Sequence, residues 1–249
     1  MIYFFSVFFS VLLAQSLAFS TSRLVGGNEA AKPHGRYQAS LQNLSNYHVC
    51  GGAVITEQHV LTVAHCVHNA SPEYVYLIVG TNNLQQGPRT AYNVSSIIEH
   101  EYYNATSRLN DIAIVKSSGS FDLKFTDILP LYPLELQEGD PLMLTGFGAF
   151  EPHGDSSSIL YMLNMQVFSQ STCKYAMRYT KEVADTMFCT FQEKGSGTCH
   201  GDSGGPILKD NQLAGLISWG IPCAVGFPDV HTRINHYIPW IHDKIIPAK

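Results

Sequence analysis

The sequence lacks an excess of basic residues: 15 lysines and arginines stand against 20 acidic residues, giving a formal net charge of −5. A nucleic-acid-binding surface needs clustered positive charge to neutralise phosphates, so neither DNA nor RNA is an expected partner. Charged residues make up only 14% of the chain and hydrophobic residues 45%, and no segment has the composition of a disordered region. The 249 residues can therefore build a substantial core.

No pair of cysteines has the Cys-x-x-Cys spacing of a structural zinc site, so the cysteines are not expected to bind metal. Three disulfides formed in an oxidising compartment are the simpler interpretation, although six cysteines can pair in many ways and the sequence alone does not choose. The six are Cys50, Cys66, Cys173, Cys189, Cys199 and Cys223.

Charge is also absent from the first 18 residues, MIYFFSVFFSVLLAQSLA. This apolar run ends in Ser16-Leu17-Ala18, whose small residues suit a signal peptidase, so residues 1–18 are predicted to be a signal peptide even without a basic residue. A membrane anchor is the alternative, but the run is short and lacks basic flanks. We expect a secreted, extracellular protein with no stable membrane association.

Four Asn-x-Ser/Thr sequons agree with secretion and are candidate glycosylation sites: Asn43, Asn69, Asn93 and Asn104. Chance occurrence is the alternative reading, and Pro72 directly after the second sequon makes Asn69 the least favourable acceptor.

Helical patterns are scarce after residue 23, where short segments rich in β-branched and aromatic residues are separated by Gly, Asn, Asp and Pro clusters. This pattern is typical of an all-β barrel or sandwich and lacks the alternating helices that a parallel sheet needs. The predicted strands span residues 49–55, 59–63, 74–80, 111–117, 141–148, 161–169, 205–209 and 213–220.

The length of this all-β region suggests two barrels, and Pro130, Pro133 and Gly139 mark the place where one could end and the next begin. We assign residues 24–130 to an N-terminal barrel and residues 131–249 to a C-terminal barrel with a final helix.

The final helix is predicted in the segment NHYIPWIHDKIIPAK, with Asn235 as its N-cap and Pro247 at its end. Ile238, Ile241 and Ile245 would share one face of this helix and pack against the barrel.

The stretch GSGTCHGDSGGP (195–206) surrounds Ser203 with glycines. It is not a P-loop, because no Lys-Ser/Thr pair and no helical pattern follow the glycines. It is a poor linker too, since a cysteine, Asp202 and the strand-like GPILK lie within or directly after it. We interpret it as a tight turn that presents Ser203, whose hydroxyl needs a base, a group that orients the base, and donors for an oxyanion.

Five motifs in order, LVGG (24–27), TVAHC (62–66), NDIAIVK (110–116), GDSGGP (201–206) and SWG (218–220), resemble the trypsin and chymotrypsin family of serine endopeptidases. The resemblance covers roughly residue 20 to the end. It implies two antiparallel six-stranded Greek-key β-barrels with a C-terminal α-helix, a peptidase domain over residues 24–249, and no cofactor.

The resemblance implies a catalytic triad in which Ser203 is the nucleophile, His65 the base and Asp111 the carboxylate that orients His65. The N–H groups of Gly201 and Ser203 would form the oxyanion hole. Taken outside the NDIAIVK motif and the order of the five motifs, Asp111 could be only a turn residue. A metal pair of His65 with His68 is the other alternative, but no third ligand is apparent.

In the family pattern Gly197 forms the floor of the primary specificity pocket, where trypsin-like members carry an aspartate. Glycine there favours Phe, Tyr, Leu or Met before the scissile bond. Asp229, where the family usually has glycine, is shared with some crustacean collagenolytic relatives and suggests secondary cleavage after Arg or Lys. Alternatively Asp229 turns away or binds water, and the enzyme is purely chymotryptic. The other expected substrate-binding residues are Thr198, His200, Ser218, Trp219 and Gly220.

The sequence Arg23-Leu24 resembles the family's activation site, so residues 19–23 are a predicted propeptide. The α-amine released at Leu24 would pair with Asp202 and order the pocket. Leu24 replaces the usual Ile or Val and should fit its slot less well. The family pattern also implies three disulfides: Cys50–Cys66, Cys173–Cys189 and Cys199–Cys223.

The loop over residues 80–94 contains no Asp or Glu, so it is not expected to bind the calcium that many relatives hold there. Expected partners are protein or peptide substrates, protein protease inhibitors and an activating protease, and the protein is expected to be a monomer.

Two other function classes fit the sequence less well. An inactive homologue that acts as a binding module would usually have lost Ser203, His65 or Asp111, and all three are present. An esterase or lipase on an α/β fold would have the chain order Ser, Asp, His, whereas this chain runs His, Asp, Ser.

Overall fold

A computed structural model describes residues 24–86 and 90–246. The predicted signal peptide (1–18), the propeptide (19–23) with Arg23, and Pro247 lie outside the described residues. Within the described part of the chain, no helix is both long enough and apolar enough to cross a membrane.

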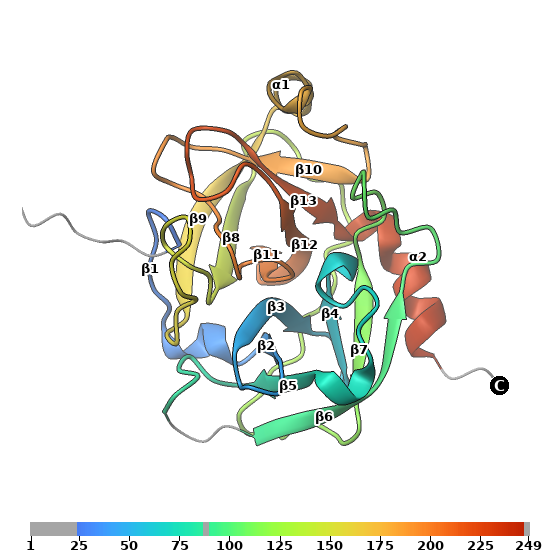
Figure 1. Ribbon diagram of the computed structural model, residues 1–249. Helices are drawn as coiled ribbons and strands as arrows, with labels where there is room; N and C mark the ends of the chain where they lie inside the picture. The colour runs from blue at the N-terminus through green and yellow to red at the C-terminus, as the bar shows by residue number, and fades with distance from the viewer. Residues whose placement is uncertain (1–23, 87–89, 247–249) are drawn as a thin grey trace, which may run out of the picture.

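The first half of the chain forms a closed antiparallel barrel with the strand order β2-β3-β4-β7-β6-β5 (Figure 1). Its interior is filled by apolar side chains such as Leu41, Leu77 and Val115, which are almost fully buried. The strands are β2 (Gln38–Gln42), β3 (His48–Val54), β4 (His59–Thr62), β5 (Tyr76–Val79), β6 (Thr90–Glu99) and β7 (Ala113–Ser117).

The second half forms another six-stranded antiparallel barrel, ordered β8-β9-β10-β13-β12-β11 and closed by the pairing of β11 with β8. Leu144, Phe188 and Ile207 lie in its core. A short strand, β1 (Asn28–Glu29), adds to the outside of β9. The barrel strands are β8 (Pro141–Gly146), β9 (Tyr161–Phe168), β10 (Met187–Thr190), β11 (Pro206–Lys209), β12 (Gln212–Trp219) and β13 (Asp229–Arg233).

The two barrels share a third core beneath the C-terminal helix α2 (Ile234–Ile245), drawn in red in Figure 1. Ile241 of α2 is fully buried there, in one cluster with Leu61 of the first barrel and Leu213 of the second. Because one helix packs on both barrels, it fixes their relative position and with it the cleft between them. The other elements are α1 (Gln170–Met177) and the 3₁₀ turns η1 (Lys32–Gly35), η2 (Ala64–Cys66) and η3 (Pro72–Tyr74).

The prediction that Asn235 caps α2 is wrong. The helix begins two residues earlier, with Arg233 as its N-cap, and the amide of Asn235 donates a hydrogen bond to Glu135 instead (2.7 Å). The helix also continues through Pro239, although a proline inside a helix removes one backbone hydrogen bond. The predicted isoleucine face is confirmed: Ile241 is buried, and Ile238 and Ile245 pack against the same core.

All eight predicted strands are present, with ends that differ by one or two residues. The structure adds strands β1, β2, β6, β10 and β13, which the apolar pattern did not predict. The predicted division at residue 130 falls in the connection between β7 and β8, where Leu131 bridges Leu213. Three disulfides, Cys50–Cys66, Cys173–Cys189 and Cys199–Cys223, have the pairing that the resemblance implied.

Candidate active site

A cleft of about 230 Å³ opens at the junction of the two barrels. The first barrel contributes His65 and Arg108 to its lining, and the second contributes Ser203, Trp219 and Asp229. Residues that are far apart in the sequence therefore meet here, at the place where a substrate chain could contact both halves of the molecule.

His65 lies in the 3₁₀ turn η2, directly after β4, and its ring is fixed by Asp111. Nδ1 of His65 lies 2.7 Å from Oδ2 of Asp111, and the backbone N–H of His65 donates to Oδ1 at 2.8 Å. With Nδ1 held in this way, Nε2 is the ring nitrogen that remains for proton transfer.

Asp111 is buried before β7 and is held from the second barrel as well. Oγ of Ser218 donates to Oδ2 of Asp111 at 2.6 Å, and Oγ1 of Thr232 donates to its backbone carbonyl at 2.7 Å. Burial by itself would raise the pKa of Asp111, but the hydrogen bond and charge of His65 and the hydrogen bond of Ser218 outweigh it, so the pKa lies below its usual value. The carboxylate is ionised and rigidly placed.

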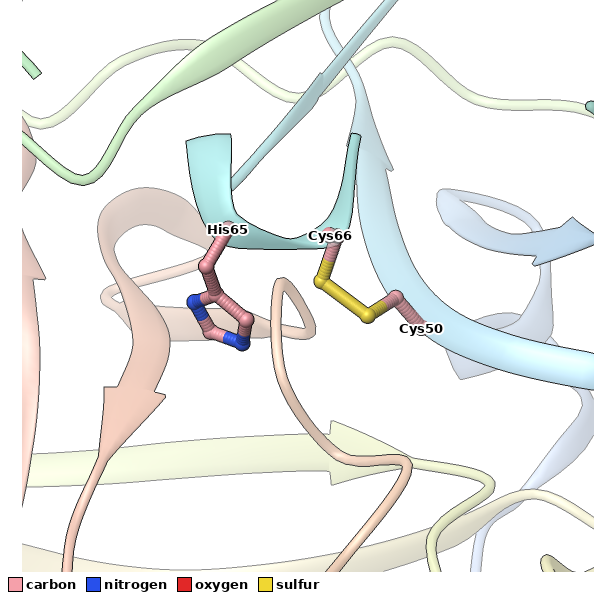
Figure 2. A group of neighbouring side chains, drawn as sticks. All are labelled: Cys50, His65 and Cys66. Atoms are coloured by element: carbon pink, nitrogen blue, oxygen red, sulfur yellow. A yellow bond between two sulfur atoms is a disulfide. The ribbon is translucent and has the colours of Figure 1, made fainter. Parts of the chain in front are cut away.

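Figure 2 shows the Cys50–Cys66 disulfide beside His65. The two sulfurs and the ring nitrogen of His65 lie within 4.8 Å of one another, which is close enough for a metal site. Both sulfurs are bonded in the disulfide and are not thiolates, so this group is a structural brace for η2. His68 turns to Glu99 (2.7 Å) and does not join His65 in a cluster of described ligands.

Ser203 sits in a turn that docks against β3, where the N–H of Gly51 donates to the Ser203 carbonyl at 2.7 Å. Gly201 has φ +91°, and a Cβ there would lie 2.7 Å from Oγ of Ser156, so only glycine fits. Among the described residues, none accepts a hydrogen bond from the N–H of Gly201 or of Ser203. Two unused donors beside a serine hydroxyl are suited to receive an oxyanion.

His48 supports this turn from the first barrel. Its Nε2 lies 2.9 Å from the carbonyl oxygen of Gly201, and its Nδ1 lies 2.8 Å from Oγ of Ser40. Burial lowers the pKa of His48 to about 4, so the ring is neutral near pH 7 and Nε2–H donates to Gly201. Nothing in the sequence pattern singled out His48.

The floor of the cleft is formed by Asp229. A Cβ on Gly197 would lie 2.7 Å from its Oδ2, and a Cβ on Gly220 would lie 2.8 Å from its Oδ1. The carboxylate therefore fills the space that the two glycines leave, and Gly197 itself does not line the cleft. The N–H of Thr198 donates to Oδ2 at 2.7 Å, yet burial raises the pKa of Asp229 to about 7.

Comparison with known proteins agrees with this geometry. The family model described as trypsin matches residues 24–241. Chymotrypsin-2 of Vespa crabro is 33% identical over 222 residues, which cover 88% of this chain and 98% of the relative. Trypsin I-P1 of Gallus gallus is 35% identical over 225 residues, 88% of each chain. The chain belongs to the trypsin family.

The solved structure of neuropsin, a serine protease expressed in the limbic system of mouse brain, superimposes on this trypsin-family chain with a TM-score of 0.80. The two are 28% identical, and the match covers 88% of this chain and 99% of neuropsin. The protein is thus a serine protease of the trypsin family, a hydrolase that acts on peptide bonds. The two named relatives above differ, since one is a chymotrypsin and the other a trypsin.

Asp202 is completely buried next to the trypsin-family serine. The N–H groups of Gly148 and Cys199 donate to its two oxygens at 2.9 and 3.0 Å. The pKa of Asp202 is raised to about 7, chiefly by burial and also by the nearby charge of Asp229. The two hydrogen bonds oppose this rise but do not cancel it. No cation among the described residues offsets this charge. Leu24, whose α-amine is the expected partner of Asp202, is almost fully buried in the core of the second barrel.

One edge of β12 is open beside the cleft. Strand β11 pairs with β12 only as far as Leu216, so residues 218–220 have no strand partner on that side. Ser218, Trp219 and Gly220 line the cleft together with Thr198 and His200. An extended peptide could therefore add to this edge by backbone hydrogen bonds.

The structure brings together the catalytic and substrate-binding residues that the sequence predicted, except that Gly197 lies behind Asp229, and it does not pair Leu24 with Asp202. Sequence reasoning missed Arg108, His48, and the hydrogen bonds of Ser218 and Thr232 to Asp111. The four sequon asparagines are all exposed.

Proposed function

We propose that this protein is an active endopeptidase that cleaves peptide bonds through an acyl-enzyme on Ser203. Nε2 of His65 takes the proton of the Ser203 hydroxyl as Oγ attacks the carbonyl carbon, and then gives that proton to the leaving amine. Asp111 stabilises the imidazolium that forms in between. Water then attacks the acyl-enzyme, with His65 again the base, and frees the carboxylic acid.

The observation that carries this proposal is the coupling of His65 to the buried, ionised Asp111, next to two unused N–H donors. In the tetrahedral intermediate the carbonyl oxygen becomes an anion, and the N–H groups of Gly201 and Ser203 would stabilise it by about 3–4 kcal/mol each.

The proposed specificity is chymotrypsin-like, with Phe, Tyr, Leu or Met before the scissile bond and secondary cleavage after Arg or Lys. Apart from Asp229, Arg108 and two histidines, the residues that line the cleft are uncharged, which favours apolar side chains around Asp229. The Asp229 carboxylate forms no ion pair with a described residue, so a substrate guanidinium or ammonium would supply the missing partner.

We further propose that the chain is secreted as a zymogen and activated by cleavage after Arg23. The uncompensated, buried carboxylate of Asp202 supports this, because a new α-amine at Leu24 would give it the cation it lacks. Residues 24–249 would then be the mature, monomeric peptidase domain, glycosylated at one or more of its exposed sequons and subject to protein inhibitors.

The test is labelling of the activated protein with a fluorescent active-site phosphonate, followed by cleavage profiling on a peptide library. Ser203→Ala should abolish both signals, whereas Ser118→Ala, a change at an exposed serine after β7, should leave both intact. Labelling that survives Ser203→Ala would disprove the proposal. A library profile without apolar residues before the scissile bond would disprove the specificity only.

A further inference from the structure

Two positively charged side chains are associated with the cleft that Trp219 lines. Arg108 lines the cleft from the first barrel, in the loop that leads to Asp111. Lys181 lies in the segment after α1 of the second barrel, and its Nζ is 5.7 Å from the centre of the Trp219 ring. One cation lies over the Trp219 ring, and another, from the first barrel, lines the same cleft as Trp219.

The two segments that carry these cations are packed together and are not loose surface loops. Leu109 and Trp219 both pack on the cluster of buried residues formed by Cys173, Met177 and Val183. The Arg108 loop is also closed on itself, since the N–H of Arg108 donates to the carbonyl of Asn104 at 2.8 Å. The backbone that carries Arg108 is therefore fixed before any ligand arrives.

Neither cation has an acidic partner in the described part of the chain. Arg108 donates to the hydroxyl of Tyr103 at 2.9 Å, and Lys181 contacts the Trp219 ring. By contrast, Lys174 and Arg233 in the same barrel are paired with Asp185 and Glu135. In a protein with a net charge of −5, two half-buried cations left unpaired beside a binding cleft are an unusual use of charge.

We infer that Arg108 and Lys181 form a basic subsite over Trp219 that selects acidic side chains in the substrate segment preceding the scissile bond. The inference rests on the proposed endopeptidase function. A peptide paired with the open edge at residues 218–220 would run past Trp219, so the side chains of its second to fourth residues before the scissile bond would reach the two cations. A glutamate or aspartate there would gain charge-assisted contacts, and a lysine or arginine would be repelled.

The expected size of the preference for Glu over Gln follows from the partial exposure of Arg108 and Lys181 to solvent. Ion pairs at half-exposed sites change binding by about two- to five-fold each, so two cations should favour Glu over Gln by roughly ten-fold. The preference should weaken in about 1 M NaCl, because the screening length then falls to about 3 Å.

The experiment compares peptides with Phe before the scissile bond and Glu, Gln or Lys at the second to fourth preceding positions. The measured quantity is the ratio of kcat/KM for the Glu peptide to that for the Gln peptide. Arg108→Gln and Lys181→Gln should each lower the ratio about three-fold, and the double variant should bring it near one. Arg108→Lys should retain most of the preference. Lys124→Gln, which removes an exposed charge elsewhere, should leave the ratio unchanged.

A Glu-to-Gln ratio near one in the wild type, or a ratio that survives the double variant, overturns the inference. The same ratio measured as binding of uncleaved peptides to Ser203→Ala, by fluorescence anisotropy, tests the basic subsite without any turnover. A protein that binds the Glu peptide preferentially but hydrolyses nothing would support the subsite and refute the proposed activity. A protein that hydrolyses all peptides at the same rate would support the proposed activity and refute the subsite.

Discussion

Replacing Asp229 by asparagine should make the preference between Arg and Phe substrates independent of pH. In the wild type the carboxylate lies at the floor of the cleft, is 3% exposed, and has a pKa raised by burial to about 7. Below that pH the pocket is neutral and apolar. Above it the pocket carries a negative charge that an arginine or lysine side chain can neutralise.

The magnitude follows from the titration. About one tenth of an acid is ionised one pH unit below its pKa and about nine tenths one unit above it. The ratio of kcat/KM for an Arg peptide to that for a Phe peptide should therefore rise about ten-fold between roughly pH 6 and pH 8, because kcat/KM reports the free enzyme. Protonation of Asp202, which does not line the cleft, affects both substrates alike and cancels in this ratio.

The assay uses two fluorogenic peptides that differ only in the residue before the scissile bond, measured with activated enzyme at intervals across that pH range. Asn keeps the size of Asp229 and can still accept the Thr198 N–H, so a flat ratio in Asp229→Asn would isolate the charge. Asp229→Gly should remove cleavage after Arg and also improve cleavage after Phe, because the space between Gly197 and Gly220 is vacated. A flat ratio in the wild type, or an equal rise in Asp229→Asn, would refute the reasoning.

Three further predictions concern activation, chemistry and stability. Arg23→Gln should stay inactive on a peptide substrate after treatment with a protease that activates the wild type; full activity without a cut would contradict the zymogen switch. Ser203→Ala and His65→Ala should each lower kcat by roughly 10⁴–10⁶, and the double variant should be little worse, since the residues act as a unit; additive losses would mean independent roles. Because the pKa of Asp229 is raised from 3.8 to about 7, the stability that its bound proton provides is complete below about pH 4 and is lost as the pH rises through 7. The loss is on the order of 4 kcal/mol. In a Ser203→Ala background, the free energy of unfolding in urea should therefore rise for Asp229→Asn relative to its parent between about pH 4 and pH 8. A difference that stays constant over this range would argue against the raised pKa.

The sequence alone was enough to propose the chemistry of the site, because each proposed catalytic group lies inside a short contiguous motif. His65 is fixed by the TVAHC turn and Ser203 by a glycine-rich turn, and both turns are determined by residues within a few positions. Strands with apolar, β-branched patterns were predicted for the same reason, since the pattern and the strand are both local.

Strands β2 and β13 escaped prediction because their buried positions are polar. Gln38 is almost fully buried and accepts a hydrogen bond from Thr145, and His231 is fully buried against Thr190. Such side chains are acceptable inside a barrel only once a distant strand supplies the partner. A reading that expects apolar residues in the core cannot recognise them.

Only the tertiary structure decided what surrounds the reacting groups. Ser218 reaches Asp111 across 107 positions of sequence, and Asp229 fills the space beside Gly197 from a different segment. Arg108 and Trp219 line one cleft, and Lys181 contacts Trp219, for the same reason, although no motif contains any two of them. These contacts depend on strand register, barrel closure and the docking of α2 on both barrels. Local sequence encodes which turn or strand a segment forms, but not which distant side chain will stand opposite it.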